Sequence, residues 1–359
     1  MKFKKIFSLV IFCLFFMCGC GIKDERTTIQ FASWGSKSEV DIIKPMLLEF
    51  EKQNDIKVEF MHIPQNYFQK IHLLFASNTA PDVIFINNLY LPVYANFLEE
   101  MKPSDVFYPQ ALEALSYNGK LYAIPRDVSN LVIFYNKDLF DKKGVPYPSE
   151  NWTFDEFLKT AQKLTDKNCF GISFEEEPLF YLPYLMSNGG GFYDVEKPES
   201  REAIQFYADL RKKYHVAPQK SESASATMGQ MFLQQRLGMY LSGHWMVPKL
   251  REEADFRWDV AQFPKGTKGS IVPLDASGWA VSKSSKHKNE ALKLVEFLSS
   301  KESSEKIMQC GLIVSARKDV KESSKVFSNA IKTSVPTPVK PDYREVLDKI
   351  KKDLEPVFN

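Results

Sequence analysis

The fold class is decided by one stretch near the start of the chain, residues 28–87, which reads TIQFASWGSKSEVDIIKPMLLEFEKQNDIKVEFMHIPQNYFQKIHLLFASNTAPDVIFIN. The chain enters it as a strand. Apolar residues spaced by three and four then predict an amphipathic helix over 38–54, and alternation of apolar and charged residues predicts a strand over 56–60. A second helix is expected over 67–77, and the uninterrupted apolar run at 82–87 predicts a strand buried on both faces of a parallel sheet. This order of elements indicates a layered α/β lobe.

The middle of the chain predicts a second α/β lobe by the same reasoning. An apolar strand is expected at 131–135, and Thr153 and Glu156 have the spacing of a capping box at the start of a helix. The remaining expected elements are strands at 169–174, 238–242 and 277–282 and helices at 198–214, 228–237, 289–300, 318–332 and 342–354. Two lobes are therefore expected, without an internal repeat.

The first 21 residues, MKFKKIFSLVIFCLFFMCGCG, have the pattern of a bacterial lipoprotein signal. Three lysines precede an apolar core at 6–17, which is too short to cross a hydrocarbon layer of about 30 Å. Gly19 precedes Cys20, which we expect to be acylated. We therefore expect residues 1–19 to be a signal peptide and 20–27 a lipid-anchored tether. The rest of the chain would be exported and held at the outer face of the cytoplasmic membrane or within the periplasm.

The composition of the exported part argues against nucleic-acid, metal and cofactor binding. Removal of a 19-residue leader from the 359-residue chain leaves 340 residues, enough for two domains or one large one. Without the three leader lysines, 44 basic residues face 45 acidic ones, so no excess charge attracts nucleic acid. Cys169 and Cys310 are the only cysteines after Cys20, and two distant cysteines form neither a disulfide scaffold nor a metal site. We expect them to be buried thiols rather than a bridge.

Several short motifs follow one another along the exported chain. They are ASW at 32–34, APDV at 80–83, GKLYAIP at 119–125, FYNKDLF at 134–140, WTFD at 152–155, FLQQRLGMYLSGHW at 232–245, FPKG at 263–266, GWAV at 278–281 and EFL at 296–298. No single motif is specific. Their order and spacing resemble those of the extracellular solute-binding lipoproteins of carbohydrate ABC importers, the family that includes maltose-binding and glycerol-phosphate-binding proteins.

The resemblance implies a type II periplasmic-binding-protein fold of the α/β class, with two lobes that are mixed sheets flanked by helices and a hinged cleft between them. Lobe 1 would comprise residues 28–125 and 270–312, and lobe 2 residues 126–269 and 313–359. The implied function is that of a monomer, not an enzyme, which captures a sugar or sugar-like solute and delivers it to the transmembrane subunits of an ABC permease. The ligand stays open between a mono- or oligosaccharide, a polyol and a glycerol phosphodiester.

A sugar presents a face of C–H bonds and a rim of hydroxyls, so its site needs flat aromatic rings and planar polar groups. Trp34 follows the first strand, and Trp245 lies just after the end of another. Ligands of open α/β sheets bind at such carboxyl ends. Trp279 follows Gly278. Together with the resemblance, these positions make candidate ligand contacts of Trp34, Trp245, Gly278 and Trp279. Trp258 is instead expected to lie within a strand.

Planar polar groups are the candidates for binding sugar hydroxyls. Asn87 and Asn88 end the buried strand, and Asp127 follows the GKLYAIP motif. Arg317 lies near residue 312, where the chain would pass from lobe 1 back to lobe 2. Each has an alternative: the asparagines cap the next helix, the carboxylate pairs with a neighbouring arginine, or the guanidinium is solvated. Tyr181, in a stretch rich in Pro and Gly, either forms an adjustable wall of the cleft or packs within a loop.

Two other classes of protein are alternatives: a lipid-anchored glycoside hydrolase and a surface adhesion lipoprotein. A glycosidase needs two facing carboxylates about 5–10 Å apart. The consecutive glutamates at 175–177 are better explained as a solvated loop, as is the Ser-rich segment 221–225. The chain has no nucleophile elbow, no His-Glu-x-x-His helix and no phosphate-binding loop. An adhesin gives no reason for glycine-adjacent tryptophans in both lobes, so a binding protein is the main expectation.

Overall fold

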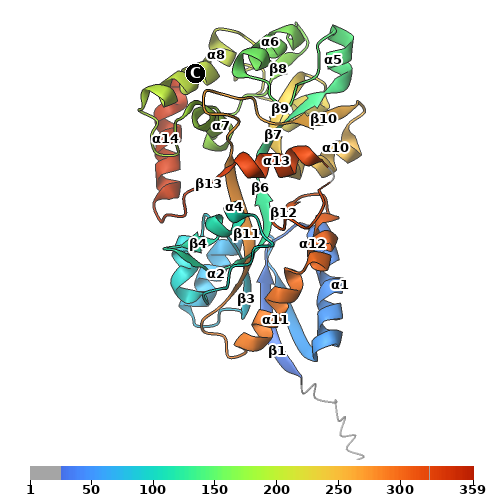
Figure 1. The fold of residues 1–359 in the computed structure, drawn as a ribbon, viewed down its shortest axis with the longest axis vertical. Helices are drawn as coiled ribbons and strands as arrows, with labels where there is room; N and C mark the ends of the chain where they lie inside the picture. Colours follow the sequence, from blue (N-terminus) through green and yellow to red (C-terminus); the bar gives the residue numbers. More distant parts are fainter. Residues whose placement is uncertain (1–25, 323) are drawn as a thin grey trace, which may run out of the picture.

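The computed structural model describes residues 26–322 and 324–359, which form two lobes stacked along the long axis of the molecule (Figure 1). Lobe 1, in the lower half of Figure 1, is built on a seven-stranded sheet, and lobe 2 is built on a four-stranded sheet. The expected signal peptide, Cys20 and most of the expected tether lie outside the described residues. Within the described part, none of the helices has the length and apolar character needed to span a membrane.

The sheet of lobe 1 has the strand order β12, β6, β11, β3, β1, β2, with β13 paired to β11. Both β2 and β3 run parallel to β1, whereas β11 is antiparallel to β3 and β6, so the sheet is mixed. The strand bounds are β1 (Thr27–Ser33), β2 (Ile56–His62), β3 (Val83–Asn87), β6 (Ile124–Ser129), β11 (Pro273–Val281), β12 (Val314–Ser315) and β13 (Val335–Pro336).

The first helix of lobe 1 begins at the carboxyl end of β1, where a capping box fixes its start. The Ser36 hydroxyl accepts from the Glu39 N–H, and the Glu39 carboxylate accepts from the Ser36 N–H, so two otherwise unpaired donors are satisfied. The helices and short strands of lobe 1 are α1 (Lys37–Asn54), α2 (Tyr67–Ala76), α3 (Leu91–Tyr94), η1 (Ala95–Phe97), α4 (Pro109–Ala114), β4 (Ser116–Tyr117), β5 (Lys120–Leu121), α11 (Lys288–Leu298) and α12 (Lys301–Met308).

Lobe 2 surrounds a sheet with the order β10, β7, β9, β8, in which β9 is parallel to β8 and antiparallel to β7. Its strands are β7 (Leu131–Asn136), β8 (Phe170–Ile172), β9 (Leu237–Gly243) and β10 (Trp258–Ala261). Its helices are α5 (Lys137–Lys143), α6 (Phe154–Leu164), α7 (Pro178–Asn188), α8 (Pro198–Lys212), α9 (Met228–Leu233), η2 (His244–Met246), α10 (Val247–Glu253), α13 (Lys325–Thr333) and α14 (Tyr343–Phe358).

Several separate segments connect the lobes. The chain passes from β6 to β7 through Asn130, and it returns between β10 and β11. After β12 it packs α13 against β7, returns to pair β13 with β11, and ends with α14 against α7 and α8. The carboxyl-terminal segment therefore contributes to both lobes, and β6 and β11 carry the sheet of lobe 1 up to the junction (Figure 1).

The α/β class and two-lobed architecture expected from the sequence are confirmed, and most elements lie within a few residues of their expected bounds. The clearest error is α7, where the content of proline suggested a loop. Pro178 occupies the first turn, where its missing N–H is not needed, and Gly189 ends the helix with a φ of 99°. Because α7 is buried on almost all sides, it has no apolar stripe of helical period to be recognised.

Candidate functional site

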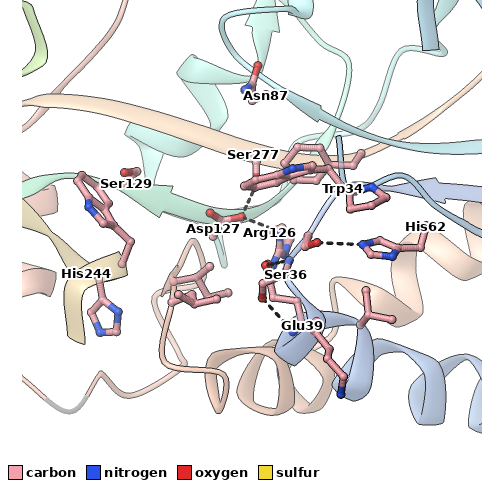
Figure 2. Close-up of a pocket in the computed structure, with 18 of the residues that line it drawn as sticks. Trp34, Ser36, Glu39, His62, Asn87, Arg126, Asp127, Ser129, His244 and Ser277 are labelled. Carbon is pink, nitrogen blue, oxygen red and sulfur yellow. Dashed lines mark hydrogen bonds and ion pairs between the residues drawn. The ribbon is translucent and has the colours of Figure 1, made fainter. Parts of the chain in front are cut away.

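A cavity of about 950 Å³ lies between the lobes, where the ends of β1, β2 and β3 and the faces of β6 and β11 meet the first turn of α1 (Figure 2). Lobe 2 contributes His244 and Trp245, which follow β9. Figure 2 shows His244 on the opposite side of the cavity from Trp34 and His62. Side chains from both lobes therefore line this one cavity.

Two exposed tryptophans line the cavity, one from each lobe. Trp34 follows β1 and is 46% exposed, with its ring 6.0 Å from the ring of Phe85. Trp245 lies in the η2 turn after β9 and is 36% exposed. A Cβ at Gly243 would lie 1.9 Å from Cζ3 of Trp245, so only glycine there allows this ring position. Exposed indole faces are unusual for tryptophan and suit stacking against a flat apolar surface.

A buried charge network forms the floor of the cavity. The Arg126 guanidinium donates to the Glu39 carboxylate, and its Nη1 lies 3.7 Å from Oδ1 of Asp127 (Figure 2). The Ser277 hydroxyl donates to the same Asp127 oxygen. The Arg126 side chain is about 3% exposed and lies over the rings of Phe85 and Trp279. Asp127 therefore does both things that the sequence left open: it pairs with a neighbouring arginine, and it lines the cavity.

The charges of this network perturb one another. Burial raises the pKa of Asp127, and the charge of Arg126 and the hydrogen bond from Ser277 offset only part of that rise. Burial also pushes the pKa of Glu39 upward, but Arg126 and the hydrogen bonds from Ser36 outweigh burial and leave that pKa below its ordinary value. The pKa of Arg126 is raised because its two carboxylate neighbours outweigh burial. Arg126 therefore stays protonated, and its positive charge is balanced by the neighbouring carboxylates.

A second buried carboxylate, Asp275 on β11, lines the cavity beside Ser277. Its Oδ1 accepts hydrogen bonds from Nδ2 of Asn88 at 2.9 Å and from the Thr337 hydroxyl. Burial raises its pKa, and these two hydrogen bonds offset part of the rise. Sequence reasoning missed Asp275. The signal that could have found it is the polar residue at every second position, 275 and 277, within an otherwise apolar strand.

A family model for bacterial extracellular solute-binding proteins matches residues 35–305. The chain belongs to that family. The galactooligosaccharide-binding protein of Bacillus subtilis is 24% identical over an alignment of 387 residues, which covers 96% of this chain and 90% of that protein. An uncharacterized lipoprotein of the oleD 5′ region in Streptomyces antibioticus is 25% identical, over 79% of this chain and 70% of that protein.

Among solved structures, the ABC substrate-binding protein Lmo0181 of Listeria monocytogenes, in complex with cycloalternan, superposes with a TM-score of 0.80. The two proteins are 28% identical, and the match covers 93% of this chain and 94% of Lmo0181. The family consists of solute-binding proteins, which are not enzymes. The two-lobed fold with a cavity between the lobes is therefore that of a solute-binding protein.

The structure brings four of the sequence-predicted residues of this solute-binding protein together at the cavity: Trp34, Asn87, Asp127 and Trp245. Asn87 also caps the turn that follows, because its Oδ1 accepts from the N–H of Tyr90 at 3.2 Å. Asn88 is fully buried behind the cavity, and its amide group bonds to Asp275 and to the backbone N–H of Ala276. The prediction that Asn88 lines the ligand site is therefore corrected: it joins β3 to β11.

Gly278 and Trp279 do not line the cavity, which corrects a second prediction. Trp279 is 0% exposed and packs edge-on against Phe31, with ring centroids 5.3 Å apart. It lies within β11, on the face of the strand that points into the core of lobe 1. A Cβ at Gly278 would lie 2.4 Å from the carbonyl oxygen of Ile124, so this glycine allows β11 and β6 to approach closely.

Tyr181 and Arg317 are also placed away from the cavity. Tyr181 is 0% exposed within α7, and its ring packs 5.3 Å from that of Phe358 in the core of lobe 2, so it forms no adjustable wall. Arg317 donates from Nη1 to the carbonyl oxygen of Ser299 and from Nε and Nη2 to Asp319, each at 2.9 Å. Its guanidinium therefore fastens the segment after β12 rather than facing the cavity.

The acidic segment 175–177 is less solvated than expected. Glu176 pairs with the buried Arg211 at 3.0 Å, and Glu177 pairs with Lys351. Glu175 is half-buried, and burial together with the charge of Glu177 raises its pKa to about 7. With the Ser-rich segment, these residues line a second cavity of about 550 Å³ in lobe 2.

The two cysteines in the described part of the chain are free thiols, so no bridge joins them. Cys169 is buried, which raises the pKa of its thiol to about 11. Cys310 is partly buried. Among residues 26–322 and 324–359, His, Cys, Asp and Glu side chains do not cluster as a metal site would require. The preference for buried thiols over a disulfide is thus confirmed for Cys169, and Cys310 is unbridged but less buried.

Proposed function

We propose that this protein is the sugar-binding component of an ABC importer. The observation that carries the proposal is the pair of exposed indoles, Trp34 from lobe 1 and Trp245 from lobe 2, on one cavity with a polar floor. Indole faces match the C–H face of a pyranose ring. Asn87, Asp127 and Asp275 provide acceptors for its hydroxyl groups. Closure of the lobes would bring the two indoles toward a ligand held between them.

The names of the relatives support this assignment. One relative is named for galactooligosaccharides, and the structure of Lmo0181 contains cycloalternan. The protein would act as a monomer, and lipid on Cys20 would hold it at the membrane near the permease. One relative is itself named a lipoprotein. A glycoside hydrolase or an adhesin is not favoured, because the family consists of solute-binding proteins.

For the lobe boundaries, we propose the expected division with three adjustments: the first and third crossings are moved, and β13, which pairs with β11, is assigned to lobe 1. The first crossing is placed at residue 130 instead of 125, because β6 pairs with β11 as far as Ser129. The second crossing is kept near residue 270, ahead of β11. The third is placed after β12, because Val314 and Ser315 pair with β6 of lobe 1. These crossings would form the hinge about which the lobes close.

Fluorescence titration of the purified protein tests the proposal. The panel comprises galactooligosaccharides, cycloalternan, maltooligosaccharides, monosaccharides, polyols and glycerol phosphodiesters. A sugar that binds is expected to change the tryptophan emission and to raise the melting temperature by mass action. Trp245→Ala should weaken binding by about 1–3 kcal/mol if the indole stacks on the sugar. Trp258→Phe, on β10 of lobe 2, is the matched control and should leave affinity unchanged.

One result would count against the proposed function, and another would count only against the role of Trp245. Emission and melting that do not respond to any member of the panel, together with release of product from a glycoside, would favour a hydrolase. A folded Trp245→Ala variant with unchanged affinity would remove Trp245 from the site while leaving the class of protein intact.

A further inference from the structure

Four polar side chains on the cavity floor come from two adjacent antiparallel strands. Asp127 on β6 pairs in register with Ser277 on β11, and Asp275 on β11 pairs with Ser129 on β6. Residues two apart on a strand share a face, so both carboxylates and both hydroxyls face the cavity, which all four residues line. These four residues thus form a compact patch with two carboxylates, and the basic side chain beside it on the floor is Arg126.

The nearest cation cannot compensate both carboxylates. Arg126 is shared between Glu39 and Asp127 and is covered by aromatic rings, with its Cζ 5.4 Å from the Trp279 ring centroid. It approaches Asp127 only at 3.7 Å. Asp275 receives only neutral donors, from Asn88 and Thr337. Counting Glu39 with Arg126 as a neutral pair leaves the charges of Asp127 and Asp275 in excess.

The other basic groups that line the cavity lie at its rim or are engaged elsewhere. Lys37 is exposed and pairs with Asp41 at 2.7 Å, and Lys44 is exposed on α1. Nε2 of His62 lies 2.9 Å from the carbonyl oxygen of Gly35. On the lobe 2 side, His244 faces Glu322 at 3.4 Å. Among the described residues, Arg126 is therefore the only basic group within ion-pair distance of either floor carboxylate.

We infer that Asp127 and Asp275 make this floor an anion-rejecting subsite, so that the cleft takes neutral or amine-bearing sugars and excludes phosphorylated or carboxylated ones. This inference rests on the proposed function. A phosphate placed beside two partly desolvated carboxylates is repelled, and the only buried guanidinium in the lining is already paired. Hydroxyl and ammonium groups can instead donate to the carboxylates, whose side-chain hydrogen bonds within the described part of the chain all go to Oδ1. Glycerol phosphodiesters are thereby excluded as ligands.

Calorimetric titrations at pH 7.5 and 150 mM salt test this inference. The probes are glucose, galactose, maltotriose and galactotriose, each as the free sugar, the 6-phosphate and the 6-amino-6-deoxy derivative. For each parent that binds, we expect the phosphate to bind at least about tenfold more weakly and the amine to bind at least as tightly. Asp127→Asn and Asp275→Asn should each reduce the discrimination against phosphate. Asn keeps an acceptor oxygen for the hydrogen bonds that Asp275 receives from Asn88 and Thr337.

The control is Asp259→Asn, which removes an exposed carboxylate from β10 and should leave the discrimination unchanged. A phosphate that binds as tightly as its parent overturns the inference and leaves the sugar-binding function standing. Discrimination that persists in the Asp127→Asn/Asp275→Asn variant, with its melting temperature unchanged, also overturns it, because other groups then reject the anion. If none of the twelve probes binds, the inference fails, and the wider ligand panel described above decides the proposed function separately.

Discussion

Removal of the Arg126 side chain is expected to destabilise the protein strongly, because it leaves two carboxylates without their cation. The guanidinium donates to Glu39 and lies 3.7 Å from Asp127, and the Arg126 and Glu39 side chains are 3% and 5% exposed. In Arg126→Met, the methionine keeps most of the apolar stem that packs on Phe85 and Trp279. The loss is therefore mainly electrostatic, and breaking a buried pair from one side costs about 3–5 kcal/mol in the free energy of unfolding.

The partner substitution Glu39→Gln is expected to cost less, about 1–2 kcal/mol. Arg126 keeps Asp127 as a counter-charge, and the glutamine amide oxygen can still accept from the N–H of Ser36, which preserves the cap of α1. In Glu39→Gln/Arg126→Met only Asp127 is left uncompensated. The double variant should therefore recover about 1–2 kcal/mol relative to Arg126→Met.

The pH dependence of the stability of the same variants provides an independent test. In the wild type the pKa of Glu39 lies below its ordinary 4.5, so its stabilising contribution is present above pH 4.5 and is lost as the pH falls through the folded pKa. In Arg126→Met, burial acts without the cation and raises that pKa, so protonation relieves the variant on acidification. The stability difference between wild type and Arg126→Met should thus narrow from pH 7.5 to pH 5.

Urea unfolding followed by circular dichroism, at both pH values, measures these differences. If Arg126→Met lowers the free energy of unfolding by less than about 1 kcal/mol at pH 7.5, the view that this buried ion pair stabilises the fold is refuted. A difference that widens on acidification would refute the assignment of the effect to the Glu39 carboxylate.

Three further outcomes are expected. Gly243→Ala should displace the Trp245 ring, since the new Cβ would lie 1.9 Å from Cζ3, and should weaken sugar binding about as much as Trp245→Ala with little change in the melting temperature. Cys20→Ser should abolish labelling by radioactive palmitate and release the protein from the membrane fraction. Glu175→Gln should stabilise the protein increasingly from pH 5 to pH 8, because the pKa of Glu175 is raised to about 7 and its ionisation disfavours the folded state. Ligand titration, membrane fractionation and calorimetry across pH measure these effects.

For each of these three predictions, one outcome would contradict the reasoning. Unchanged affinity in Gly243→Ala would mean that the Trp245 ring relocates without consequence for binding. Palmitate labelling that survives Cys20→Ser would place the lipid elsewhere or remove the lipoprotein assignment. A stability difference between Glu175→Gln and wild type that stays constant with pH would show that Glu175 does not titrate near neutrality.

Local pattern was sufficient for the two exposed tryptophans at the cavity. Trp34 and Trp245 follow directly on the ends of β1 and β9, and the carboxyl ends of strands face the cleft in sheets of this kind. Trp279 has a similar glycine neighbour but lies in the interior of β11, so its ring enters the core. The apolar run around it is the signal that distinguishes the two cases.

Long-range pairing decided the rest of the site. Asp275 reaches the floor only because β11 lies between β3 and β6, which precede it by more than a hundred residues in the chain. Asn88 is withdrawn from the cavity by bonds to Asp275 and to Thr337. No local pattern encodes such contacts, since burial depends on which distant segments meet.

The sequence by itself determined the α/β class, the capped start of α6, the strand ends that carry Trp34 and Trp245, and the pattern of the export signal. Helix period, strand alternation and capping are local properties, so they can be recognised without the fold. The tertiary structure decided which polar groups share the cavity floor and which are consumed by pairing with one another. The physical reason is that the charge state and accessibility of Arg126, Asp127 and Asp275 depend on desolvation by neighbours brought together only by folding.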